Sequence, residues 1–232
     1  MVAELMMAKN PGTPAETLAK LARYDDFLVR KVVAENPSTS AETLAELAGD
    51  ESYSVRLYVA KNPHTPAETL KELSTSIDVV VRTWIAYNGN TSTETLSTLA
   101  KDEDNDVRNG VACNENTLAE TLAELAGDKD FFIRENVAHN PNTSAETLYK
   151  LAKDEHFYVR EAVAWNKNAS AETLSILAKD KSYSVRRAVF IRQMNATATE
   201  VCLDDLLKPE INPGSAAVSP KKETTDPVKM KL

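Results

Sequence analysis

The segment "NPSTSAETLAELAGD" (36–50) is one of several nearly identical segments in this chain of 232 residues. "NPHTPAETLKELSTS" (62–76) and "NPNTSAETLYKLAKD" (140–154) repeat it closely. Such self-similarity is typical of proteins built from stacked copies of one small unit. The asparagine that opens each segment recurs every 26 residues without slippage, at Asn10, Asn36, Asn62, Asn88, Asn114, Asn140 and Asn166.

The spacing divides residues 1–208 into eight units, which we call layers, and positions within a layer are numbered as columns 1 to 26. The common pattern is roughly "x-x-V-R-x-x-V-A-x-N-P-x-T-x-A-E-T-L-x-x-L-A-x-D-x-x", and the eighth layer is degenerate. We expect these layers to form one domain, followed by a disordered tail over 209–232 that is rich in Pro, Ser, Thr and Lys. The layers are 1–26, 27–52, 53–78, 79–104, 105–130, 131–156, 157–182 and the capping layer 183–208.

Columns 13 to 22 predict a helix with an explicit start. In the first layer Thr13, proline and Glu16 form the pattern of a capping box. Leucine in columns 18 and 21 and alanine in column 22 give the spacing of a buried helical stripe. Gly49 and Gly127 follow this stripe, where a left-handed C-terminal residue is expected. The threonine–glutamate pair recurs at Thr39/Glu42, Thr65/Glu68, Thr91/Glu94, Thr117/Glu120 and Thr143/Glu146.

Columns 1 to 9 predict a second, shorter helix that ends at the column-10 asparagine, often with a proline after it. No segment alternates with period two, so the sequence predicts no strands. One such helix pair is too short to bury an apolar face alone. Stacked layers would bury columns 3, 7, 8, 18 and 21 in one continuous core, which predicts an all-α solenoid.

The string "VREAVAWNKNASAETLSILAKD" (159–180) and its siblings resemble the leucine-rich repeat variant family. The family wording "VRxxVAxNPxTxxxxLxxLAxD" matches columns 3 to 24, and the resemblance covers residues 1–208. It implies a right-handed superhelix of alternating α-helices and short α- or 3₁₀-helices, without strands. A weaker likeness to HEAT-like repeats lies in the "VRxxVA" core. Neither resemblance determines an activity, because repeat folds host many functions.

Two polar columns recur beside the core. An arginine occupies column 4 from Arg30 to Arg186, between the buried columns 3 and 7. We expect ion pairs with the glutamates of column 16 or the aspartates of column 24, rather than a row of arginines that binds phosphates or acidic peptides. We likewise expect the column-10 asparagines to bond backbone groups where the chain turns. Both columns therefore predict structural bonds within the stack.

Columns 2, 5, 6 and 9 share one face of the shorter helix, and this face does not repeat. It holds both tryptophans and three of the seven tyrosines of the chain. Repeat proteins keep the core constant and vary the surface that meets a partner, so we expect this face to bind a protein or peptide. We also expect Gly110 to leave a dip between Trp84 and Trp165. The candidate partner-binding residues are Leu57, Tyr58, Trp84, Tyr87, Cys113, His139 and Trp165.

Another interpretation of this face stays open. Columns 2 and 6 would pack between layers, especially at Phe132 and Tyr158, and only columns 5 and 9 would be free. In that case part of the aromatic content serves stability, and the surface that can meet a partner is narrower.

The sequence shows no pattern typical of an active site. Three histidines fall in different columns, and Cys113 with His139 would supply only two metal ligands. There is no glycine-rich phosphate loop and no "HExxH" motif. We therefore expect a non-enzymatic protein without cofactor or metal.

Charge argues against nucleic acid as the first partner. The net charge is −8, and Lys31, Lys61 and Arg187 alternate with acidic residues along the variable face. A nucleic-acid-binding or accessory role of the HEAT-like kind is the alternative function.

Two cysteines cannot form a disulfide framework, and no run approaches the ~20 apolar residues of a membrane helix. The start "MVAELMMAKNPGT" lacks a signal-peptide pattern. We expect a cytoplasmic monomer without membrane contact. We expect five apolar residues to close the end of the core, namely Phe190, Val201, Leu203, Leu206 and Leu207.

Overall fold

The computed structural model describes the backbone of residues 2–207 and the side chains of residues 2–195. This part of the chain contains fifteen helices and no strand, and the sequence predicts the absence of strands. The helix of columns 1 to 9 was expected to be the shorter one, but in layers two to seven it is an α-helix of 9 residues, and the other helix has 7 or 8. The helices of columns 1 to 9 are α1 (Val2–Lys9), α3 (Phe27–Glu35), α5 (Tyr53–Lys61), α7 (Val79–Tyr87), α9 (Asn105–Cys113), α11 (Phe131–His139), α13 (Phe157–Trp165) and the start of α15 (Tyr183–Leu207). The helices that follow column 14 are α2 (Ala15–Leu21), α4 (Ala41–Ala48), α6 (Ala67–Leu73), α8 (Thr93–Leu99), α10 (Ala119–Leu125), α12 (Ala145–Leu151) and α14 (Ala171–Leu177).

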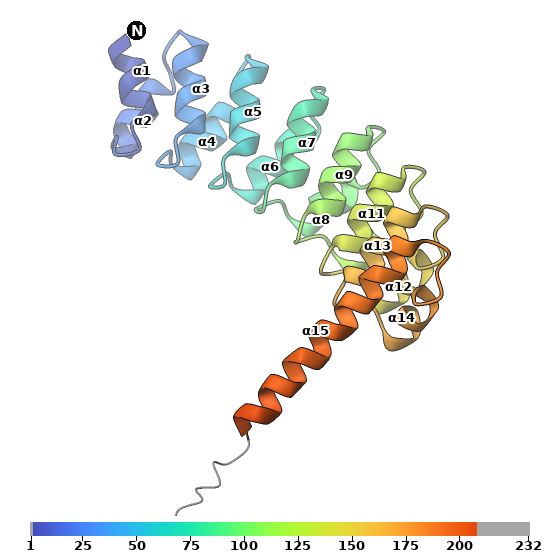
Figure 1. The fold of residues 1–232 in the computed structure, drawn as a ribbon. Coiled ribbons are helices and arrows are strands. Elements are labelled where there is room, and N and C mark those ends of the chain that lie inside the picture. Colours follow the sequence, from blue (N-terminus) through green and yellow to red (C-terminus); the bar gives the residue numbers. More distant parts are fainter. Residues whose placement is uncertain (1, 208–232) are drawn as a thin grey trace, which may run out of the picture. The chain divides into compact units, whose positions relative to one another are not determined.

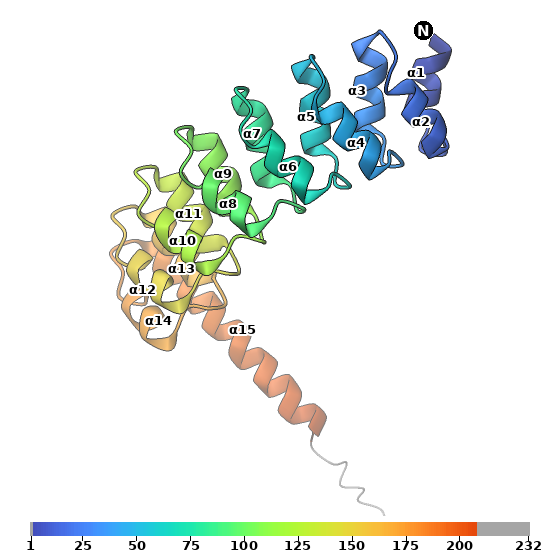
Figure 2. The same cartoon turned by 180° about the vertical axis from the view of Figure 1, so that it is seen from behind.

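The helices form two rows, which Figures 1 and 2 show from opposite sides. Each odd-numbered helix packs against the next odd-numbered helix, from α1 with α3 to α11 with α13. The even-numbered helices form the other row. The chain divides into two compact units, Met1–Gln193 and Met194–Leu232, and the stack described below belongs to the first.

The core consists of the columns that the repeat predicts. In the fifth layer, Val107, Val111 and Leu122 have no exposed surface, and the equivalent residues of layers two to seven are buried in the same way, except that Leu174 is half-buried. In the first layer Ala3 and Met7 are exposed. Burial of such a side chain stabilises the fold by about 1.5–3 kcal/mol. Because layers two to seven add nearly the same set, the core continues from one layer to the next.

The helix start differs from the predicted capping box by one residue. Ser92 in column 14 is the N-cap of α8, and its hydroxyl accepts a hydrogen bond from the backbone N–H of Thr95 at 3.2 Å. Thr91 instead donates its hydroxyl to the carbonyl of Ile85, in the last turn of α7, at 2.6 Å. Glu94 is therefore the second helical residue rather than the third, and the capping-box prediction is wrong. The same serine cap occurs at Ser40, Ser144 and Ser170.

The prediction that Gly49 and Gly127 adopt a left-handed backbone conformation is also wrong. Gly49 closes α4 with φ −85° and ψ 8°, and Gly127 likewise has no positive φ. The chain stays near helical geometry here, because the N–H of Asp50 bonds back to the carbonyl of Leu47 at 3.1 Å. A residue with a side chain could adopt this turn without strain.

The column-10 asparagines link each layer to the one before it, which confirms their structural role. Asn114 donates its amide to the carbonyls of Ala86 and Asn88 in the preceding layer, at 2.7 and 3.0 Å. Its amide oxygen accepts the N–H of Asn116 at 2.9 Å. The equivalent bonds recur at Asn36, Asn62, Asn88, Asn140 and Asn166.

A second asparagine ladder, in column 12, was not predicted. Asn90 donates to the carbonyl of Pro63 in the preceding layer at 2.6 Å, and Asn168 donates to Pro141 at 2.7 Å. The signal was present in the sequence, because four consecutive layers have asparagine in this column. Its members are Asn90, Asn116, Asn142 and Asn168.

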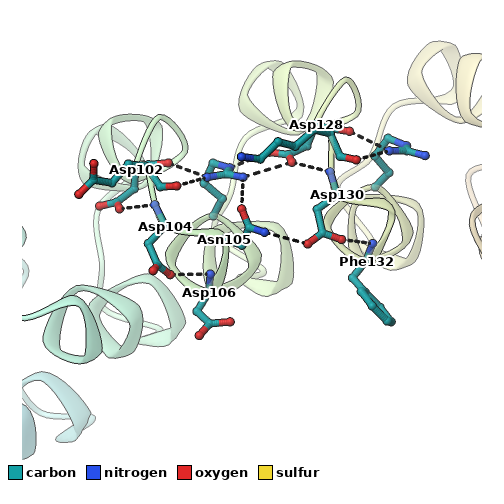
Figure 3. A network of polar contacts seen from close by, with 11 residues as sticks. Asp102, Asp104, Asn105, Asp106, Asp128, Asp130 and Phe132 are labelled. Carbon is teal, nitrogen blue, oxygen red and sulfur yellow. Dashed lines mark hydrogen bonds and ion pairs between the residues drawn. The ribbon is translucent and has the colours of Figure 1, made fainter.

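The column-4 arginines form partly buried ion pairs, also as predicted. Arg108 Nε lies 2.7 Å from an Asp128 oxygen, and Arg108 Nη1 donates to the carbonyls of Asp102 and Glu103 at 2.8 and 2.9 Å. Each arginine thus ties the aspartate of its own layer to the backbone of the preceding layer. Figure 3 shows consecutive links around Asp102 and Asp128.

The partner of these arginines is the column-24 aspartate and not the column-16 glutamate. The third layer has Ser76 in column 24, and Arg56 pairs with Asp78 instead. Because the charges are neutralised at close range, the six arginines from Arg30 to Arg160 are not available to a phosphate or an acidic peptide. Arg186 is exposed and bonds only the carbonyls of Asp180 and Lys181 among the described contacts. The other pairs are Arg30–Asp50, Arg82–Asp102, Arg134–Asp154 and Arg160–Asp180.

The eighth layer changes the repeat. Arg192 occupies column 10, and its guanidinium donates to the carbonyls of Ala164 and Asn166, the acceptors that an asparagine uses elsewhere. The column-10 asparagine is the C-cap of the odd-numbered helices in layers two to seven, and without it α15 continues to Leu207. Phe190 was expected to close the core, yet 62 % of its surface is exposed, so the prediction is wrong for this residue. The other four predicted closing residues and the tail over 209–232 lie outside the described side chains.

Candidate binding face

The variable face lies on the odd-numbered helices, and its four columns differ in exposure. Column 9 is exposed in layers two to seven, whereas column 6 becomes buried at Gly110 and Ala162. Column 2 is open at Phe132 and Tyr158, which are 58 % and 47 % exposed. In layers two to eight, column 6 is buried or half-buried except at Trp84, which is 39 % exposed, so the alternative interpretation holds for column 6 outside the fourth layer and is wrong for column 2. The reason is geometric, since column 6 faces the preceding odd-numbered helix.

Tyr58 and Leu57 are the candidates that pack inward. Both are half-buried against the core. The Tyr58 ring lies beneath two ammonium groups, with Lys31 Nζ 4.5 Å and Lys61 Nζ 5.2 Å from the ring centroid. A cation over an aromatic ring is attracted to its π-face. Tyr58 therefore holds Lys31 and Lys61 in place, and little of its own ring is left for a partner to contact.

Trp84 and Tyr87 form an exposed aromatic pair on α7. Their ring centroids are 6.1 Å apart, and Lys61 Nζ lies 4.3 Å above the Trp84 ring. A groove between α5 and α7 runs beside them. The groove is lined by Ala60, Lys61, Pro63, Trp84, Tyr87, Asn88 and Gly89.

Gly110 does not leave a dip. It is buried, and a Cβ added to it would lie 2.8 Å from the Ala86 Cβ and 3.2 Å from the Tyr87 ring. The absence of a side chain at Gly110 therefore lets α7 and α9 approach closely, and the Tyr87 ring covers the space. The hydroxyl of Tyr87 accepts a hydrogen bond from Asn109 at 2.9 Å, and Asn109 accepts one from Asn136 at 2.7 Å.

The remaining candidates do not join this groove. Trp165 lines a different groove, between α13 and α15, with Glu161, Tyr183 and Arg187. Cys113 and His139 occupy column 9 between the two grooves, and both are exposed. Although the residue reaches the surface, neighbouring atoms shield its sulfur from part of the solvent. This desolvation raises the pKa of the Cys113 thiol, so the thiol stays protonated near neutral pH. The seven candidates thus fall into separate groups along the face.

Column 1 adds aromatic residues beside the face that were not predicted to belong to it. Phe131 and His156 stack with ring centroids 3.8 Å apart, and Phe157 lies 5.5 Å from His156. Glu155 and Lys181 line a groove beside this cluster. The sequence did contain a sign of this cluster, because column 1 is repeatedly aromatic. Its aromatic residues are Phe27, Tyr53, Phe131, Phe157 and Tyr183.

The described residues contain neither a metal-ligand cluster nor a membrane-spanning helix. No group of three or more His, Cys, Asp or Glu side chains within residues 2–195 could hold a metal ion. Within the same part of the chain, no helix combines the length and the hydrophobicity that a bilayer crossing requires.

Comparison with known proteins gives the family. The sequence model described as "leucine rich repeat variant" matches residues 27–52, which is the second layer. A solved structure described as a leucine-rich repeat variant with a novel repetitive structural motif is 30 % identical, with a TM-score of 0.58, and the match covers 76 % of this chain and 70 % of that one. No curated protein matches the sequence.

Two further solved structures are more distant. The X-ray structure of YIBA_ECOLI is 18 % identical with a TM-score of 0.42, over 89 % of this chain and 80 % of that chain. An engineered protein is 16 % identical with a TM-score of 0.39, over 90 % and 81 %. Neither similarity bears on the assignment, which rests on the helical repeat and the match over most of both chains. The chain belongs to the leucine-rich repeat variant family.

Proposed function

We propose that this chain is a non-enzymatic scaffold that binds a protein or peptide segment along the variable face. The principal contact is the groove between α5 and α7. The observation that supports it most is the exposure of Trp84 and Tyr87, which keep 39 % and 41 % of their surface although layers pack on both sides. Partly exposed Trp and Tyr side chains beside a groove are typical centres of binding energy.

The groove is also held in a fixed shape. Asn88 in its floor donates to the carbonyls of Ala60 and Asn62 at 2.7 and 3.0 Å. The Tyr87 ring is held through its hydroxyl by Asn109. A preformed site loses little conformational entropy when a partner binds, so more of the contact energy appears as affinity.

The test is selection of peptides on the purified full chain. A phage library of random peptides about 16 residues long is long enough to cross roughly five layers in extended form. Enriched peptides are then synthesised and titrated by fluorescence anisotropy. We expect Trp84→Ala to weaken their binding about tenfold or more, which corresponds to ~1.4 kcal/mol. The matched control is Tyr53→Ala, which removes an exposed ring of α5 outside the groove and should leave affinity unchanged.

Circular dichroism and the melting temperature separate binding from folding. Trp84→Ala should keep the helical content and a melting temperature within a few degrees of wild type. If it unfolds the stack, Trp84→Phe retains an aromatic ring beside Lys61 and is used in its place. Unchanged peptide affinity in the folded variant, or a library from which nothing is enriched, would contradict the proposal.

A further inference from the structure

The variable face changes the sign of its charge halfway along the stack. In the first four layers its charged residues are mostly lysines, and in the last four they are mostly carboxylates. The first group is Lys9, Lys31 and Lys61 with Glu35, and the second is Asp106, Glu135 and Glu161 with Arg187. Trp84 and Tyr87, in the fourth layer, stand at the boundary between the two halves.

These charges differ from those of the arginine ladder because they form no ion pair with another described side chain. No ion pair among residues 2–195 involves Lys31 or Lys61, whose ammonium groups lie over the Tyr58 and Trp84 rings instead. The carboxylates of Asp106, Glu135 and Glu161 likewise form no ion pair within the described side chains. Each of these groups is exposed or half-buried. A partner can therefore reach both sets of charges.

A groove like the one beside Trp84 lies two layers earlier. Lys9, Val32, Glu35 and Pro37 line a groove between α1 and α3, in the same columns as the groove between α5 and α7. Neighbouring helices lie ~8–10 Å apart, so the two grooves are about 20 Å from each other. An extended chain rises ~3.3 Å per residue and spans this distance with about six residues. The face is thus suited to a segment that crosses the helices.

We propose that the partner of this face is one extended peptide segment whose acidic and basic residues are grouped at opposite ends. Its acidic end lies over Lys31 and Lys61, and its basic end lies over Asp106, Glu135 and Glu161. An apolar side chain between them enters the groove beside Trp84 and Tyr87. This inference rests on the proposed function and adds the chemistry of the partner.

A second copy of the chain is the competing occupant, because two faces with oppositely charged halves complement each other in antiparallel orientation. The grooves favour the peptide. Trp84 and Tyr87 are about three-fifths buried, and Ala60 and Gly89 form the groove beside them. A single side chain from an extended segment reaches between α5 and α7, whereas a broad helical face would meet mainly the rims of the two rings.

The experiment uses the same library and two synthetic peptides about 16 residues long with one composition. One peptide has its acidic and basic residues grouped on either side of a central leucine, and the other has them in alternation. We expect the grouped peptide to bind about tenfold more tightly, and library peptides to show the same grouping. Lys31→Glu with Lys61→Glu should remove this preference. The matched control is Lys20→Glu with Lys179→Glu, which makes the same change in net charge outside the variable face.

The outcomes separate the two proposals. Library peptides that depend on Trp84 but show no grouping of charge, or equal affinity for the two synthetic peptides, overturn the inference and leave the proposed function standing. Failure of every peptide to bind overturns both. A dimer in sedimentation at low ionic strength that dissociates in the Lys31→Glu, Lys61→Glu variant would show that the occupant is a second copy, which also overturns the inference.

Discussion

Asparagine 114 illustrates, at the scale of one residue, how a layer is joined to the layer before it. Its amide donates to two carbonyls of the preceding layer and accepts one N–H from its own turn. The two bonds to the preceding layer are buried, where each unsatisfied backbone group would cost about 1–3 kcal/mol. An aspartate could accept but not donate, and a serine could not reach three partners in one plane. The amide explains why asparagine recurs in this column.

Gly110 allows a direct test of packing between layers. An alanine in the middle of a helix is usually favoured over glycine by about 1 kcal/mol. At Gly110 the added Cβ would lie 2.8 Å from the Ala86 Cβ and 3.2 Å from the carbonyl oxygen of Thr83. Overpacking of this kind costs about 1–3 kcal/mol, so we expect Gly110→Ala to lower the free energy of unfolding by roughly 1 kcal/mol in urea titration.

Gly49→Ala is the matched control for that variant. Its φ is −85°, and the nearest atom to an added Cβ is 3.8 Å away. We expect this variant to be as stable as wild type or more stable by up to ~1 kcal/mol, because alanine restricts the unfolded chain. A Gly110→Ala protein that matches wild type in urea would show that α7 and α9 do not approach as closely as described.

Helix starts are the feature that matters most at the scale of one element. The seven-residue helices are too short to be stable alone, so hydrogen bonds to the groups at their ends contribute noticeably to stability. Ser92 caps α8, whereas Leu118 begins α10 without a side-chain hydrogen bond. Both helices have a threonine three residues later, Thr95 and Thr121, whose N–H is the donor in the capped case.

Leu118→Ser should therefore stabilise the stack. The leucine is 49 % exposed, so its removal loses little buried area. The serine hydroxyl can accept a hydrogen bond from the N–H of Thr121, as Ser92 does from Thr95. We expect a gain of about 0.5–1 kcal/mol in urea titration, and a loss of about 1 kcal/mol for the reciprocal control Ser92→Ala. No gain in Leu118→Ser beside a clear loss in Ser92→Ala would mean that α10 satisfies its first turn in another way.

The arginine–aspartate pairs govern the response of the whole stack to acid. Burial raises the pKa of Asp50, Asp102, Asp128, Asp154 and Asp180, but hydrogen bonds from the arginine and from a backbone N–H outweigh it, and the net pKa is lowered. A carboxyl with a lowered folded-state pKa contributes stability that is fully present above its unfolded pKa, about 4. That stability is lost as pH falls through the lower folded-state pKa.

We therefore expect the urea midpoint of the stack to stay level from pH 7 to pH 5 and to fall steeply below about pH 4. Asp128→Asn is the control, because it removes one titrating member. It should be less stable than wild type at neutral pH and lose less stability on acidification. Since repeat proteins do not always unfold in one step, the midpoint is followed by circular dichroism over the whole transition. A fall that begins between pH 7 and pH 5.5 would point to histidine and contradict this assignment.

Much of the molecule follows from the order of residues within one layer. The 26-residue period, the two helices per layer and the buried columns 3, 7, 8, 18 and 21 could all be predicted, because they depend on local spacing repeated many times. For the same reason, an ion pair could be predicted for Arg108, and hydrogen bonds to the backbone could be predicted for Asn114. A guanidinium or an amide beside a core must find partners there.

The tertiary structure alone decided which variable residues are free. Column 6 is buried at Gly110 but exposed at Trp84, column 2 is open at Phe132, and the hydroxyl of Thr91 bonds to α7 instead of capping α8. These outcomes depend on the distance and rotation between neighbouring layers, which arise from the packing of many side chains at once and cannot be read from one layer's spacing. The sequence by itself determined what each layer is made of, and the contact between layers decided what remains for a partner.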